Sequence, residues 1–264
     1  MSHIHIPDGV LPLWLIVAGW LVTGALVALV VRHASNHDMR RRVPLIGATA
    51  ALMLVGMSSE IIPIAYHINL TVLAGILLGP WLSIVAALIV NVMLALLGHG
   101  GVTVIGLNTF VIIVEMVSGW FLFGQFVRLV GRRRPSIAAA GATVVALALS
   151  TTVLVGVVAL GGSPAATRES GAFDPAILSF VNPFGGGVVT NTVVVPEQEE
   201  AAPQLPIARF ALVVYVLGSI GWVIEGLVTA LIVGFVARVR PGLVFEGALA
   251  SPTRRPVGDE GAHG

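Results

Sequence analysis

The chain has 264 residues, of which 56% are hydrophobic and only 10% are charged, and its mean hydropathy is +0.98. Soluble domains carry about 25% charged residues, so this composition excludes an ordinary water-soluble domain and indicates an integral membrane protein. The formal net charge of +1 does not favour a polyanionic partner such as nucleic acid. Neither Cys nor Lys is present, which excludes disulfides, thiolate metal sites and Schiff-base chemistry.

Uncharged apolar runs mark the expected spans, since a helix needs about 20 apolar residues to cross the hydrocarbon core. In chain order these spans are 11–31, 43–64, two short helices within 67–97, then 102–127, 137–160 and 210–237. The run 67–97 is divided at Gly79-Pro80, because Gly-Pro interrupts helices and the run is too long for one span. We therefore expect an all-α polytopic membrane protein, a bundle of about seven transmembrane helices.

Arginines gather after the first, fifth and seventh spans, and basic residues concentrate in cytoplasmic loops. The clusters are Arg32 with Arg40–Arg42, Arg128 with Arg132–Arg134, and Arg238, Arg240, Arg254 and Arg255. All three lie on one side if 43–97 contains three spans. The amino terminus is then outside and the carboxyl terminus cytoplasmic, and the expected location is the cytoplasmic (inner) membrane of a prokaryote.

The chain is expected to divide into four parts. Residues 1–10 form an outside segment for metal capture, and 11–130 carry the first five spans. Residues 131–243 carry spans six and seven with an outside loop at 161–205, which is rich in Gly, Pro, Ser and Thr and is interpreted as a solvated linker. The remainder, 244–264, is expected to be a disordered cytoplasmic tail.

Four of the seven histidines fall on the outer side of this topology, namely His3, His5, His67 and His99. Imidazole is the commonest metal ligand and suits Ni, Co, Cu and Zn, so this group points to a borderline divalent cation. If Met1 is removed, the Ser2 amine, the His3 amide nitrogen and the His3 ring can chelate one ion in a plane, which Ni(II) and Cu(II) prefer. If Met1 stays, the chelate gains one more amide nitrogen. The alternative to a chelate is a flexible terminus whose histidines bind nothing.

Ordered motifs along the chain then resemble one family. They are residues 5–12 (HIPDGVLP), His67 followed by 75–81 (GILLGPW), His99–Thr103 with Gly106 and Asn108–Phe110, and Ile224–Thr229 with Arg238–Pro241. These motifs resemble the CbiM/NikM family, the substrate-binding S components of energy-coupling factor (ECF) transporters for cobalt and nickel. The resemblance covers about positions 5–130 and 218–243.

The resemblance implies that an outside-facing amino terminus tucks into the bundle and captures one Co(II) or Ni(II) ion. Family ligands are the terminal amine, the first amide nitrogen, the His at the second position and a His after the second span. His5 matches the second-position His and His67 the later one, but this chain carries three extra residues, so Ile4 precedes His5. Either His3 has taken over the chelate or the true start of the chain is later. The expected ligand set is Ser2, His3, His5 and His67.

Asp8, His99 and Asn108 are the expected supporting residues. Asp8 precedes Gly9 and is interpreted as a turn former. His99 either orients a ligand through a hydrogen bond or is a plain turn residue. Asn108 either fastens the amino-terminal segment or bridges two helices.

Three acids lie within the expected spans, namely Glu60, Glu115 and Glu225. Such groups normally face the interior of the bundle, so we expect them to partner polar groups. For Glu225, contact with a partner subunit is the alternative.

The expected function is metal capture without catalytic chemistry or a cofactor of its own. The sequence has no Gly-x-x-x-x-Gly-Lys-[Ser/Thr] loop, so the expected partners are a transmembrane coupling (T) component and a cytosolic ATPase pair, with a small accessory membrane subunit as a further candidate. One alternative is an ion-coupled secondary carrier that uses the three acids as a relay. Another is an intramembrane hydrolase with Ser58 or Ser59 as nucleophile, although the Gly-x-Ser-x-Gly context is missing. Co(II) and Ni(II) both suit the ligand set.

Overall fold

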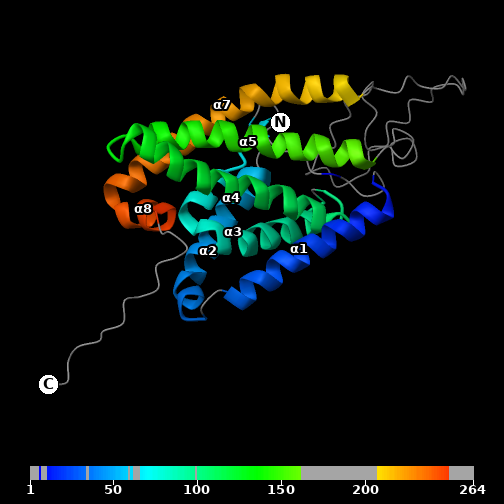
Figure 1. Cartoon of the computed structure of the whole chain (residues 1–264), viewed down its shortest axis with the longest axis horizontal. Helices are drawn as coiled ribbons and strands as arrows, with labels where there is room; N and C mark the ends of the chain where they lie inside the picture. The colour runs from blue at the N-terminus through cyan, green and yellow to red at the C-terminus, as the bar shows by residue number, and fades with distance from the viewer. Residues whose placement is uncertain are drawn as a thin grey trace, which may run out of the picture.

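The computed structural model describes residues 6, 11–33, 36–58, 60–61, 66–98, 100–161 and 207–249. Its helices are α1 (Leu13–His33), α2 (Asn36–Ser58), α3 (Thr71–Leu96), α4 (Ile105–Val130), α5 (Pro135–Gly161), α7 (Ile207–Val239) and α8 (Pro241–Leu249). Two short strands, β1 (Glu60–Ile61) and β2 (Tyr66–His67), pair antiparallel between α2 and α3. Helix α4 packs against α1, α3 and α5, and α7 lies along α5 (Figure 1). The predicted all-α polytopic bundle is confirmed.

The outward surface of the bundle is apolar, as α7 shows. Its exposed side chains recur every three or four residues, at Val216, Ile220, Val223, Leu227, Leu231 and Phe235. Its polar residues Glu225 and Thr229 are instead buried. Polar groups inside and apolar groups outside suit a bundle that is surrounded by hydrocarbon. In the described part of the chain, α1, α3, α4, α5 and α7 are long and apolar enough to cross a membrane, so the protein is a multi-pass membrane protein.

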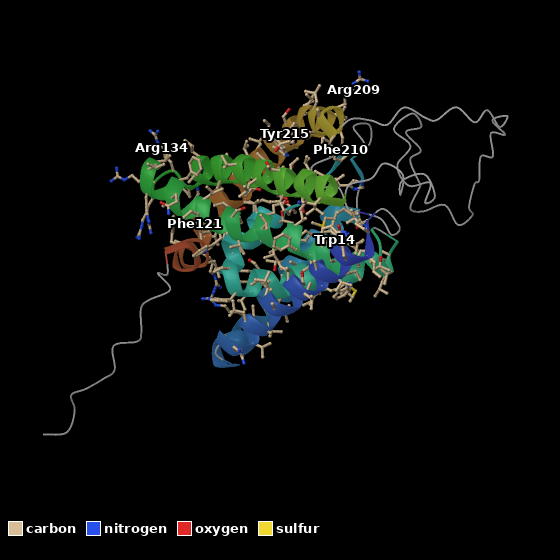
Figure 2. All side chains as sticks on the ribbon, turned by 45° about the vertical axis from the view of Figure 1, so that its right-hand side comes forward. Trp14, Phe121, Arg134, Arg209, Phe210 and Tyr215 are labelled. Carbon is tan, nitrogen blue, oxygen red and sulfur yellow. The ribbon has the colours of Figure 1, made fainter. Side chains whose placement is uncertain are left out.

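Charged side chains mark the ends of the bundle. Figure 2 shows Arg134, just before α5, and Arg209, in the first turn of α7, at opposite ends of the molecule. This placement agrees with the antiparallel packing of α5 and α7 and leaves the middle of both helices free of arginine.

Helix α3 consists of two segments that meet at Gly79-Pro80. Gly79 has φ 76° and ψ 176°, which glycine tolerates because it lacks a Cβ. The first segment follows the direction of α4, since Thr71 contacts Glu115 and Gly79 lies beside Trp120. A straight helix of 26 residues would be about 40 Å long and would end far from the start of α4. The connection 97–104 spans at most about 30 Å, which is too short to lead back from there to Ile105. The chain therefore reverses at Gly79, and the predicted division into two helices is confirmed.

The second predicted span is wrong at its end. Helix α2 ends at Ser58, and Glu60 lies in β1, so the helix does not reach Ile64. The polar residues Ser58, Ser59 and Glu60 interrupt the apolar run where the helix ends, and Pro63 opposes its continuation to Ile64, because proline disfavours helix for the residue before it. At its start, the apolar part of α2 begins at Arg42, close to the predicted Val43, and the helix continues back to Asn36 through Arg40 and Arg41, which were expected in a loop.

The predicted tail is also partly helical. Helix α8 begins at Pro241, whose fixed φ suits the first helical position. Val244 of α8 is fully buried in a cluster with α3, α4 and α5, and the Arg132 guanidinium lies 5.9 Å from the centre of the Phe245 ring. These contacts order 241–249, which corrects the prediction of disorder from residue 244. The rest of the tail and the predicted outer loop, apart from Gly161, lie outside the described residues.

Candidate metal site

Two buried polar side chains of α4 hold the chain segments next to the candidate ligands. Asn108 is 3% exposed and Glu115 is fully buried. Seven residues separate them, which is about two helical turns, so they share one face of α4 about 10 Å apart. One holds the amino-terminal segment and the other holds the segment after β2.

The Asn108 side chain is bonded to both backbone groups of Ile6. Its Oδ1 accepts a hydrogen bond from the Ile6 N–H and its Nδ2 donates one to the Ile6 carbonyl, each at 3.1 Å. The Gly101 N–H donates to the same carbonyl at 3.2 Å. The Ile6 side chain is buried, in a cluster that includes Leu11 and Leu107. The residue that follows His5 is therefore docked in the first turn of α4.

The predicted residues Ser2, His3, His5, Asp8 and His99 lie outside the described residues. Of the predicted ligands, the structure therefore places His67 only. The Asn108 contacts concern Ile6 and place none of these side chains.

His67 is the last residue of β2 and pairs with Glu60 of β1. Its side chain is partly buried and its Nδ1 atom is buried. The next residue, Ile68, packs its backbone carbonyl against Gly56 of α2, where a Cβ would come within 2.4 Å of the carbonyl oxygen. The backbone around His67 is thus held by strand pairing on one side and by close contact with α2 on the other.

The segment after His67 is tied to two buried carboxylates. The Asn69 N–H donates to Glu225 Oε1 at 3.0 Å, and Asn69 Nδ2 donates to Glu115 Oε1 at 2.5 Å. The Thr71 hydroxyl donates to the same Glu115 oxygen, and Ser150 Oγ donates to Glu115 Oε2 at 3.0 Å. Side chains of α4 and α7 therefore bind residues 69–71, and α5 binds the Glu115 carboxylate from the other side.

These contacts decide the roles of two predicted acids. Glu115 and Glu225 both bind polar groups inside the bundle, as expected. Glu225 is 1% exposed, so the alternative that it contacts a partner subunit is wrong. The side chain of Glu60 lies outside the described residues.

Sequence reasoning missed Asn69, Thr71 and Ser150. The available signal was the presence of polar side chains inside apolar runs, since an intramembrane polar residue is costly unless it has a partner. Within the described ranges, no three His, Asp or Glu side chains gather as a group that could hold a metal ion.

Loss of the Asn108 side-chain amide should release the Ile6 backbone, which lies next to the candidate ligand His5 in the sequence. We expect Asn108→Leu to weaken binding of the predicted divalent cation about tenfold, because outer partners of metal sites contribute on that scale, and to raise hydrogen exchange at Ile6. Asn91→Leu is the matched control, since Asn91 is equally buried but donates to Ala87 of its own helix. Calorimetry and exchange mass spectrometry measure the two effects. Equal affinity losses in the two variants would contradict the anchoring role.

The fold and the site together define a class of protein, a multi-pass membrane bundle in which His67 is partly buried and the backbone beside it is anchored by α2 and α4. The family model described as "Cobalt uptake substrate-specific transmembrane region", CbiM, matches residues 5–243. The chain belongs to the CbiM family. It is thus a metal transport component and not an enzyme, and the hydrolase alternative is wrong.

Individual relatives agree with this assignment. A Haloquadratum walsbyi protein named for metal transport is 32% identical over 249 residues, which cover 91% of this chain and 93% of the relative. The cobalt transport protein CbiM of Sorangium cellulosum is 30% identical over 45% of this chain and 56% of its own length. The crystal structure of a truncated transition metal transporter superposes with a TM-score of 0.64, at 16% identity, over 89% of this chain and 99% of that one. The last likeness supports the fold.

Proposed function

We propose that this chain is the metal-binding S component of an ECF-type importer, which captures Co(II) or Ni(II) on the outer face and delivers it inward. The observation that carries the proposal is the pair of anchors on one face of α4. Asn108 holds the residue after His5, and Glu115 holds Asn69, two residues after His67. Because these anchors lie about 10 Å apart, the amino-terminal segment with His5 and the segment with His67 can both reach one ion.

In this proposal the ligands are nitrogen atoms of Ser2, His3, His5 and His67. Nitrogen donors suit Co(II) and Ni(II), and the chain offers no thiolate that would select a softer ion. Cobalt is the metal in the family description and in the name of the Sorangium cellulosum relative. We therefore propose Co(II) as the transported ion and Ni(II) as its competitor.

For the supporting residues Asp8, His99 and Asn108, we propose the roles that the sequence suggests. Asp8 forms the turn after the histidine arm, and His99 orients a ligand by a hydrogen bond. Asn108 anchors the arm through Ile6.

The proposed partners are a transmembrane coupling component and a cytosolic ATPase pair, with a small accessory membrane subunit as a further candidate. The chain has no Lys and so no phosphate loop of the Gly-Lys-[Ser/Thr] type, which means that ATP must be hydrolysed by another subunit. The proposed location is the cytoplasmic membrane of a prokaryote, with the amino terminus outside. This orientation rests on the arginine clusters.

Uptake of radiolabelled Co(II) into cells that produce the chain tests the energy source. We expect uptake to fall at least about tenfold when the ATPase pair is omitted or carries a substituted phosphate-loop Lys, and to persist in a protonophore while ATP is maintained. An ion-coupled carrier gives the reverse pattern, with uptake lost in the protonophore and retained without the ATPases. That pattern would overturn the proposed coupling.

A further inference from the structure

The turn between β2 and α3 has a backbone conformation that needs support from its surroundings. Leu70 has φ 55° and ψ 11°, and it is the one non-glycine residue with positive φ in the described part of the chain. The left-handed region is unfavourable for a bulky L-residue, because its Cβ crowds the following backbone. Such a conformation persists only where neighbouring contacts over-determine it.

Polar contacts bracket Leu70 on both sides. Asn69 precedes it and donates its side-chain N–H to Glu115 and its backbone N–H to Glu225. Thr71 follows it and donates its hydroxyl to Glu115. The Leu70 side chain is itself buried in the cluster that contains Phe123 of α4 and Val233 of α7.

We infer that Glu115 is a positioning residue for His67. By binding Asn69 and Thr71 together, the Glu115 carboxylate holds the left-handed turn at Leu70 and so sets the direction in which the imidazole, two residues before Asn69, enters the bundle. We call these contacts the Glu115 clamp, made of Asn69, Thr71, Glu115 and Ser150. The inference rests on the proposed function, since it takes His67 as a metal ligand.

The clamp acts on affinity through preorganisation. A ligand arm that is already fixed loses little conformational freedom when it binds the ion, whereas a loose arm loses more and binds more weakly. A residue that acts in this way affects only the binding that passes through His67. A residue that merely stabilises the fold affects every part of the site.

The chemistry of the clamp makes a single-atom substitution informative. Glu115 accepts hydrogen bonds at both oxygens, with Asn69 and Thr71 at Oε1 and Ser150 at Oε2. A glutamine has one acceptor oxygen and one NH₂ donor group. Glu115→Gln therefore turns an N–H toward one set of donors, while the volume of the side chain is preserved.

The first measurement is the dissociation constant for Co(II) of the full-length protein in detergent. We expect Glu115→Gln to raise it about tenfold and Thr71→Val, which deletes one hydroxyl, to raise it about threefold. Thr143→Val is the matched control, because Thr143 is equally buried and donates to Ala139 of its own helix at 2.8 Å. It should stay within about twofold of the unmodified protein.

A double-mutant cycle with His67→Ala decides whether the clamp acts through His67. The expected result is that Glu115→Gln has no further effect on the weakened binding of the His67→Ala protein. The same factor in both backgrounds would overturn the inference and show that Glu115 supports the fold alone. If Glu115→Gln does not fold, the Thr71→Val cycle gives the same decision.

The cycle also separates this inference from the proposed function. Unchanged Co(II) affinity in His67→Ala would overturn the proposed ligand set, and the inference with it. Weakened binding in His67→Ala together with unchanged binding in Glu115→Gln and Thr71→Val would overturn only the positioning role.

Discussion

His67→Ala is expected to raise the dissociation constant for Co(II) at least about 100-fold, or about 2.7 kcal/mol, and to abolish cellular uptake. The side chain is partly buried on a backbone that strand pairing and the contact of Ile68 with Gly56 hold in place. In the proposed site, its loss removes one of the nitrogen ligands, and the chain has no Cys to replace it. Isothermal titration of the purified protein with Co(II) and Ni(II) measures the change.

His37→Ala is the control for this experiment. His37 lies near the start of α2, next to the arginine cluster and away from the outer end of the expected topology. Its substitution should change the affinity less than about twofold. Tight Co(II) binding by His67→Ala, in a protein that unfolds at the same temperature as the parent, would place the metal elsewhere.

Most of the bundle could be predicted because most of its helices coincide with contiguous apolar runs of the sequence. The break at Gly79-Pro80 was equally readable, since both residues act on their own local backbone. The β1–β2 hairpin was not, because Ile61, Ile62 and Ile64 resume the hydropathy of α2 after the short polar break Ser58-Ser59-Glu60. Hydropathy reports surroundings and not backbone conformation, so this polar break and Pro63 were the local signals that the helix ends earlier.

Likewise, some residues of the candidate site could be predicted from the sequence and others could not. Asn108 could be selected from the sequence as a polar residue inside an apolar span, and His67 as a histidine on the outer side that also falls in a family motif. The Glu115 clamp could not, because its bonds join residues that lie far apart along the chain. Asn69 and Glu115 are separated by 46 positions, and Ser150 and Glu115 by 35. No periodicity encodes such pairs, and only the packing of α4, α5 and α7 around the turn brings them together.

Gly75→Ala is expected to destabilise the protein by about 3 kcal/mol, the upper part of the range for overpacked interiors. A Cβ at Gly75 would lie 2.2 Å from the Met116 carbonyl oxygen and 2.9 Å from its carbon. Both are backbone atoms of α4, so no rotamer change relieves the contact and the two helices must separate. Gly75 lies one turn after Thr71, so the same movement pulls Thr71 away from Glu115 and weakens Co(II) binding as well.

Gly24→Ala is the matched control, because a Cβ there meets nothing within 4 Å. Its only expected effect is a gain of up to about 1 kcal/mol from the higher helix propensity of alanine. Thermal unfolding in detergent compares the two variants, and Co(II) titration of the folded fraction follows the second effect. If Gly75→Ala unfolds at the parent's temperature, α3 and α4 do not pack by direct backbone contact. If instead it is destabilised but binds Co(II) as tightly as the parent, then the position of Thr71 does not control the metal site. That result would contradict the proposal that the Glu115 clamp positions His67 through Thr71.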